Sequence, residues 1–121
     1  MRPARWTFTA AGIYGLVLLT PFLFVERNVA APAAGLAHPE YFYGFLLVAI
    51  AFQFLFLMIG QDPVRLRPAM IAGVIEKLPF GVTGILLWLQ GRSQAPVAIL
   101  AAVDLAWGLL FLAAWRTTPK T

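Results

Sequence analysis

Cysteine is absent from the 121-residue sequence, and histidine occurs only once, at His38. The absence of cysteine excludes disulfides, thiol redox chemistry and thiolate-held iron–sulfur clusters. His38 lies in a predicted loop, and one histidine is too few for a bis-histidine haem site or a histidine-based zinc site within one chain. We therefore expect the protein to bind no cofactor and no metal.

Charged side chains are scarce. They make up 12% of the residues, and hydrophobic residues make up 61%, against about 25% and about 45–50% in an average soluble domain. A soluble fold of this length could not cover so much apolar surface, whereas a protein that faces lipid needs no polar cover. The net charge of +4 does not indicate a nucleic-acid partner, because the basic residues are scattered among apolar segments. The expected partner is the lipid bilayer.

Four long apolar stretches occupy most of the chain, at residues 6–25, 41–60, 69–90 and 97–115. Each is close to the ~20 residues that a helix needs to cross the hydrocarbon core, and none alternates as the strands of a barrel do. Only helices and closed barrels satisfy their own backbone in lipid. We therefore predict an all-α fold: an integral membrane four-helix bundle, antiparallel, in a single domain over residues 1–121.

The lengths of the connections predict how these helices pack. The second and third connections are only a few residues long, so helices 2 and 3, and helices 3 and 4, should form antiparallel hairpins. The first connection, residues 26–40, is the longest and is rich in alanine, proline and glycine. We therefore predict that helices 2 to 4 form a compact unit and that helix 1 is the most loosely held.

Basic residues are distributed unevenly over the loops. If the N-terminus is inside, the inner flanks hold more of them than the outer loops. The inner set is Arg2, Arg5, Arg65, Arg67, Arg116 and Lys120, and the outer set is Arg27 and Arg92. The positive-inside rule then places both termini on the cytoplasmic side, N-in and C-in.

Polar side chains within the predicted spans are the residues that could carry chemistry. Glu76 and Lys77 lie in the third stretch, Asp104 in the fourth, and Gln53 in the second. Charges at membrane depth need partners. A rise of 1.5 Å per residue places Lys77 within reach of Asp104, and Glu76 at the depth of Gln53. We predict a Lys77–Asp104 bridge between helices 3 and 4, and a Glu76–Gln53 hydrogen bond between helices 2 and 3.

Two interpretations of this intramembrane polar cluster stay open. The residues could be structural clamps, which hold the bundle together without any activity. Alternatively, they could form a proton relay or a polar pocket, as intramembrane ionisable residues often do. Two carboxyl groups and one lysine leave one carboxyl group without a cation, which is what a proton-coupled mechanism would require.

Two prolines and two arginines are further candidates. Pro21 and Pro79 lie inside apolar stretches, and a proline removes one backbone hydrogen bond from a helix, so each predicts a kink. Arg65 and Arg67 lie in the loop Asp62–Pro68, where they could attract anionic lipid at the inner leaflet or contact a cytoplasmic partner.

The segment from Pro39 to Trp115 resembles small four-helix bacterial membrane proteins that are called DoxX-like. The features that carry the resemblance are Tyr43-Gly44-Phe45, the loop Asp62–Pro68, Glu76-Lys77-Leu78, and Val103-Asp104-Leu105 followed by Gly108-Leu109-Leu110-Phe111. The resemblance implies a four-helix bundle, and we expect the bacterial inner (plasma) membrane as its location. It implies no reaction, because these proteins share no catalytic motif that can be placed on this chain.

Three functions are compatible with these observations. The first is a non-catalytic accessory or association-type bundle, which could work as a homo-oligomer or within a larger membrane complex. The second is an oligomeric proton-coupled small-solute transporter that uses Glu76, Lys77 and Asp104. The third is an enzyme on a lipophilic substrate, and it ranks last because no nucleophile–base pair with helical spacing is present. We expect a protein that is not an enzyme.

Overall fold

The computed structural model describes residues 2–24 and 39–121, and these residues form four long helices. Two short 3-10 segments extend the helices. In chain order the elements are α1 (Arg2–Leu19), η1 (Thr20–Phe24), α3 (Pro39–Gln61), η2 (Arg67–Ala69), α4 (Met70–Leu89) and α5 (Ala95–Thr117).

Each of the four helical segments is long and apolar enough to cross a membrane. The spans are Pro3–Phe24, Pro39–Gln61, Arg67–Leu89 and Ala95–Thr117. The prediction of an all-α protein with four spanning helices is therefore confirmed, and the chain is an integral membrane protein. The helices begin earlier than the apolar stretches because proline fits the first turn, where its missing N–H has no partner to lose, as at Pro39 and Pro96.

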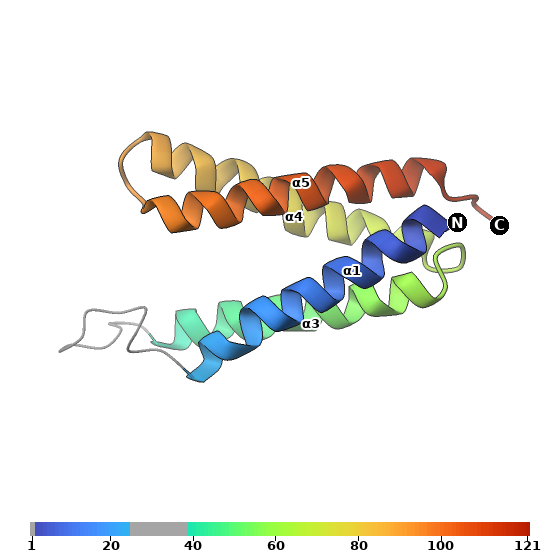
Figure 1. Ribbon diagram of the computed structural model, residues 1–121, viewed down its shortest axis with the longest axis horizontal. Helices are drawn as coiled ribbons and strands as arrows, with labels where there is room; N and C mark the ends of the chain where they lie inside the picture. The colour runs from blue at the N-terminus through green and yellow to red at the C-terminus, as the bar shows by residue number, and fades with distance from the viewer. Residues whose placement is uncertain (1, 25–38) are drawn as a thin grey trace.

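The four helices are arranged as two antiparallel pairs, α1 with α3 and α4 with α5 (Figure 1). Both chain termini lie at the same end of the molecule, which we call the terminal end. The two pairs meet at the terminal end and diverge toward the opposite, far end (Figure 1). The described residues thus form two helix pairs whose backbones converge at one end.

The prediction that helices 3 and 4 form an antiparallel hairpin is confirmed by the pair α4 and α5, but the prediction that helices 2 to 4 form a compact unit with helix 1 loosely held was wrong. Helix 1 is not loosely held, because α1 packs against α3. The helices α3 and α4 follow each other in the chain, but their backbones come close only locally and they meet mainly through side chains, as where Phe45 stacks on Phe80 with ring centroids 6.2 Å apart. Most of the long first connection lies outside the described residues, and its length did not indicate how α1 packs. A short connection places two helices next to each other at one end, but their side chains decide whether they stay together along their length.

Small residues explain the close packing of α1 on α3. A Cβ atom added at Gly12 would lie 2.8 Å from the Leu57 side chain and 2.9 Å from the backbone oxygen of Gln53. A Cβ atom at Gly15 would overlap the Gln53 side chain, and one at Gly60 would overlap that of Thr9. In lipid, helices associate by van der Waals packing rather than by the hydrophobic effect, so such close approach is what holds the pair together.

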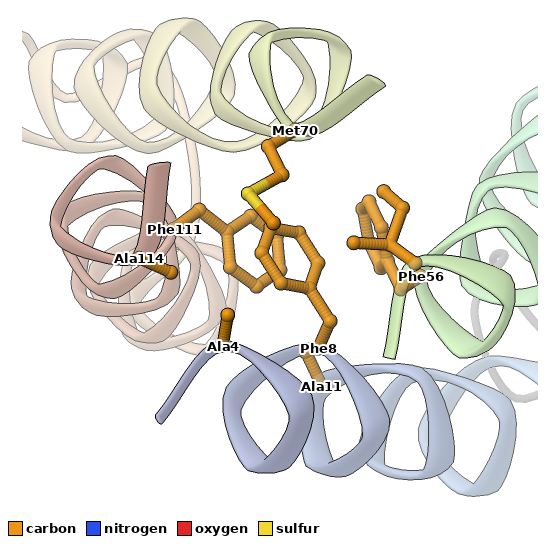
Figure 2. Close-up of a cluster of buried hydrophobic side chains, with 8 residues drawn as sticks. Ala4, Phe8, Ala11, Phe56, Met70, Phe111 and Ala114 are labelled. Atoms are coloured by element: carbon orange, nitrogen blue, oxygen red, sulfur yellow. The ribbon is translucent and has the colours of Figure 1, made fainter. Parts of the chain in front are cut away.

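The two pairs are joined at the terminal end by a core of aromatic and small side chains (Figure 2). Phe8 of α1 stacks on Phe111 of α5 with ring centroids 4.2 Å apart, and Phe56 of α3 meets Phe111 edge-on at 4.9 Å. All three phenylalanines are fully buried, and Met70 of α4 closes the cluster. One residue from each helix thus contributes to a single contact region.

The loop between α4 and α5 is closed by a glycine in the left-handed conformation. Gly91 has a φ of 73°, a backbone angle that residues other than glycine rarely adopt. Its N–H bonds the Trp88 carbonyl at 2.9 Å, and the Arg92 N–H bonds the Leu87 carbonyl at 2.9 Å. This pattern satisfies the last carbonyl groups of α4 and turns the chain directly into α5.

Replacing Gly12 by alanine should destabilise the protein. The added methyl group would clash with Leu57 and with the backbone of α3, and overpacking of this kind costs about 1–3 kcal/mol. The matched control is Gly44→Ala, since a Cβ atom at Gly44 meets nothing within 4 Å. Reversible unfolding in mixed detergent micelles, followed by circular dichroism, would measure both variants. Equal free energies of unfolding for the two variants would contradict the packing of α1 on α3.

Candidate functional site

The ion pair between Lys77 and Asp104 is the centre of the candidate site. The Nζ atom of Lys77 donates a hydrogen bond to Oδ1 of Asp104 over 3.2 Å, and this contact joins α4 to α5. The Lys77 side chain is 5% exposed, so the ammonium group depends on protein partners. The predicted Lys77–Asp104 bridge is confirmed.

Glycine residues bring the two helices close enough for this ion pair. The buried face of α4 carries Gly73, Gly81 and Gly84 together with Lys77. A Cβ atom at Gly81 would lie 2.9 Å from the backbone oxygen of Ala101 on α5. On the facing helix, a Cβ atom at Gly108 would lie 3.1 Å from the Cβ atom of Lys77. The ion pair therefore forms in a stretch where glycine lets the two backbones approach closely.

Glu76 contributes a second carboxylate beside the same lysine. Its Oε2 atom lies 3.4 Å from the Nζ atom of Lys77, but this buried oxygen has no hydrogen-bond partner among the described residues. The Nζ atom also lies 5.5 Å from the centre of the Phe56 ring on α3, within the range of a cation–π interaction. We call Glu76, Lys77 and Asp104 the triad: it holds two carboxyl groups and one ammonium group, so one carboxyl group has no cation of its own among the described residues.

The predicted hydrogen bond between Glu76 and Gln53 was wrong. Gln53 is fully buried, but its Nε2 atom donates to the Ala49 carbonyl of its own helix over 2.7 Å. Its Oε1 atom has no partner in the described part of the chain, and it faces Gly15 of α1. The two residues lie at a similar depth in the membrane, but the side chain of Gln53 points toward α1, whereas Glu76 belongs to α4. Gln53 therefore does not belong to the triad.

Sequence reasoning missed Tyr14. The ring of this α1 residue lies 5.9 Å from that of Trp107 on α5, three residues along the helix from Asp104. The triad is therefore approached from α1 as well as from α3. A tyrosine in the middle of an apolar stretch was the available signal, because its hydroxyl group favours a polar neighbour in lipid.

The two prolines differ in their effect on the helices. α1 ends at Leu19 and continues as the 3-10 segment η1, which contains Pro21. A proline at position 21 cannot donate to the carbonyl of Val17, which explains the change from α-helix to 3-10 geometry. Pro79 lies inside α4, and the helix continues through it. A kink at Pro79 stays a prediction.

Arg65 and Arg67 also differ, although they are two residues apart. Arg67 donates from Nε to the Trp115 carbonyl at 2.9 Å, and its guanidinium carbon lies 4.6 Å from the centre of the Trp115 ring. Arg67 therefore connects the segment before α4 to the end of α5. Arg65 is exposed at the terminal end and is the member of the pair that is open to lipid or to a partner.

Comparison with protein-family models, with curated proteins and with solved structures finds no match to this chain. The resemblance to DoxX-like proteins therefore has no support from a family model. Four long apolar helices are what the chain shares with small four-span membrane proteins.

Removing one partner of the ion pair should destabilise the protein, and removing both should cost less than the two single losses added together. Asp104→Asn leaves the buried ammonium of Lys77 with Glu76 alone, and we expect a loss of about 1–3 kcal/mol, below the value for a fully buried pair because Asp104 is 18% exposed. The double variant Lys77→Met with Asp104→Asn should lose less than the sum of the two single variants. Unfolding in mixed micelles would measure the coupling.

The control for the Asp104→Asn variant is Asp62→Asn, the same substitution at an exposed position. It should change the free energy of unfolding by less than about 0.5 kcal/mol. If Asp104→Asn were as mild as Asp62→Asn, the ion pair would not stabilise the contact between α4 and α5.

Arg67→Lys should lower the stability by about 1 kcal/mol, because lysine keeps the charge but cannot both stack on Trp115 and donate from a planar group. Arg65→Lys is the matched control and should have no measurable effect. Thermal unfolding in detergent would compare them, and equal melting temperatures for both variants would contradict the role given to the Arg67–Trp115 contact.

Proposed function

We propose that the protein is a non-catalytic membrane bundle that works by associating with another membrane protein. The observation that carries the proposal is the position of Lys77, which is buried between two glycine-lined helices and bonded to Asp104. An ion pair placed there acts as a structural clamp, because the ammonium group is held by protein contacts and cannot leave without separating α4 from α5.

The exposed apolar surface of the bundle supports association. The core residues come from the terminal end, and large apolar side chains are exposed on every helix, as at Val17, Val48, Ile75 and Ile99. Lipid can cover such surfaces, but lipid chains offer no hydrogen bond to the carboxyl group of the triad that has no cation of its own. Association therefore offers what lipid chains cannot supply.

The proposal includes a membrane orientation. We place both termini and the loop between α3 and α4 on the cytoplasmic side of a bacterial inner membrane, because this end carries the larger number of basic residues. Both termini lie at one end of the bundle, as an even number of spans requires (Figure 1). The DoxX-like resemblance agrees with this location and adds no activity.

Proton-coupled transport is the second candidate, and Glu76 favours it. The Lys77–Asp104 pair needs no third charge, yet Glu76 lies within 3.4 Å of the same lysine and is 19% exposed. A carboxylate that is not needed for the clamp could bind and release a proton. Since four helices make a thin wall, transport would require two or more copies.

One experiment separates the two candidates. Wild type, Asp104→Asn and Glu76→Gln would be compared for assembly in native membranes, by native gel electrophoresis after mild solubilisation, and for proton-linked uptake in reconstituted vesicles. We expect the wild type to migrate in an assembly larger than the 13.3 kDa monomer, and Asp104→Asn to lose it. Intact assembly with lost uptake in Glu76→Gln would instead support transport.

A third result would reject both candidates. If neither substitution altered assembly or uptake, the intramembrane charges would have no role in function. The exposed position Asp62 again provides the control, since Asp62→Asn changes a carboxylate outside the spans.

A further inference from the structure

Exposed basic side chains gather at the terminal end of the bundle. Arg5 lies in the first turn of α1, Arg65 in the loop between α3 and α4, and Arg116 at the end of α5. All three are exposed, and none forms an ion pair with a carboxylate of the described residues. Lys120 is exposed after α5, whereas Asp62 is the one acidic side chain described at this end. The terminal end therefore carries a surplus of positive charge.

Contacts between the helix ends bring these arginines onto neighbouring segments. A Cβ atom added at Gly60, near the end of α3, would lie 3.2 Å from the backbone oxygen of Arg5. Arg67 donates to the Trp115 carbonyl over 2.9 Å, which joins the end of the loop to the residue before Arg116. The start of α1, the loop between α3 and α4, and the end of α5 are therefore neighbours at the terminal end (Figure 1).

The buried core at this end explains why the arginines stay at the surface. Ala4 and Ala114 belong to the core cluster, and Leu66 packs against it. Each of these three residues lies within two positions of one of the exposed arginines in the sequence. Because the small and apolar neighbours are turned into the core, the guanidinium groups remain on the outside, where a ligand can reach them.

Arg67 does not belong to this set. Its guanidinium carbon lies 4.6 Å from the centre of the Trp115 ring, and its Nε atom is bonded to the Trp115 carbonyl. Of the two loop arginines that the sequence offered to anionic lipid, Arg65 is the one whose side chain is available. Arg67 instead keeps the loop against the end of α5, and so positions Arg65.

A tryptophan marks the depth of this end in the membrane. Trp6 directly follows Arg5 and is 70% exposed. Tryptophan side chains concentrate at the interface between the hydrocarbon core and water, at the level of the lipid headgroups. The orientation proposed above puts this end in the cytoplasmic leaflet, whose surface is negatively charged. Arg5 is therefore placed at the level of lipid phosphates.

We propose that the terminal end binds the phosphate group of an anionic phospholipid through Arg5, Arg65 and Arg116. Guanidinium groups bind phosphate with parallel hydrogen bonds, and an anionic lipid brings a net charge that a zwitterionic lipid lacks. This inference goes beyond the association proposed above, because it uses neither the triad nor the apolar faces of the helices.

A lipid bound there would also stabilise the fold. Arg5 belongs to the pair of α1 and α3, whereas Arg116 belongs to the pair of α4 and α5. A phosphate that contacts both arginines joins the two pairs at the end where the core cluster already connects them. A ligand that binds only the folded state raises the stability of that state. The melting temperature should therefore rise with the concentration of anionic lipid.

The test titrates the detergent-solubilised protein with phosphatidylglycerol, and with phosphatidylcholine of the same acyl chains, and counts bound lipids by native mass spectrometry. We expect tighter binding of phosphatidylglycerol. Arg5→Gln, Arg65→Gln and Arg116→Gln should each weaken that binding by about fivefold and leave phosphatidylcholine unaffected. The matched control is Arg92→Gln, an exposed arginine at the far end whose Nη1 atom is bonded to Gln90 over 3.2 Å. It should change neither titration.

Thermal unfolding in the same detergent provides the second readout. Phosphatidylglycerol should raise the melting temperature of the wild type and of Arg92→Gln, but not that of the variant in which all three terminal-end arginines are glutamine. Because these side chains are exposed, the triple variant should unfold at the wild-type temperature when no anionic lipid is present.

Four results would overturn the proposal. Equal binding of the two lipids would remove the preference for an anionic headgroup, and an equal loss in Arg92→Gln and Arg65→Gln would show an effect of total charge without a site. Displacement of the lipid by millimolar glycerol phosphate would assign the site to a soluble phosphate. Loss of the native assembly in Arg65→Gln, with lipid binding intact, would assign this surface to a protein partner.

Discussion

The close approach of α4 and α5 depends on glycine, and the rest of the site depends on that approach. In lipid, apolar side chains gain little by meeting each other rather than the acyl chains, so two helices stay together only where their surfaces fit closely. Gly81, Gly84 and Gly108 remove the side chains that would hold the helices apart. The 3.2 Å contact between Lys77 and Asp104 follows from this geometry, and it offsets the cost of placing both charges at membrane depth.

The same constraint explains how the two pairs are joined. α1 and α3 are joined by their own glycine contacts, and α4 and α5 by theirs, but α3 and α4 have no comparable small-residue seam, and their backbones come close only locally. Aromatic contacts join the pairs instead, around Phe8, Phe56 and Phe111 at the terminal end and between Phe45 and Phe80 further along. The backbones of the pairs diverge beyond the terminal end (Figure 1). The side chains of Asp104 and Glu76 are 18% and 19% exposed.

Predictions from the sequence succeeded where they depended on hydropathy, on depth in the membrane and on the faces of single helices. Hydropathy defined four spans, because a helix in lipid must satisfy its own backbone and needs a minimum length. The Lys77–Asp104 pair could also be predicted, since Lys77 shares a face of its helix with glycines and its depth is close to that of Asp104. The Glu76–Gln53 hydrogen bond could not. The sequence gives the depth of a side chain in the membrane but not the neighbouring helix that it faces. Gln53 faces Gly15 because α1 is the helix that packs against α3.

The sequence by itself determined that the chain spans the membrane four times and that a few polar residues lie within the spans. These properties depend on local composition and on the cost of exposing backbone and charge to lipid. Only the tertiary structure decided that α1 pairs with α3, that Gln53 is separate from the triad, and that Tyr14 packs against Trp107 close to it. Each of these depends on which surfaces of different helices fit together, and side-chain shape across an interface is not encoded in the periodicity of any single helix.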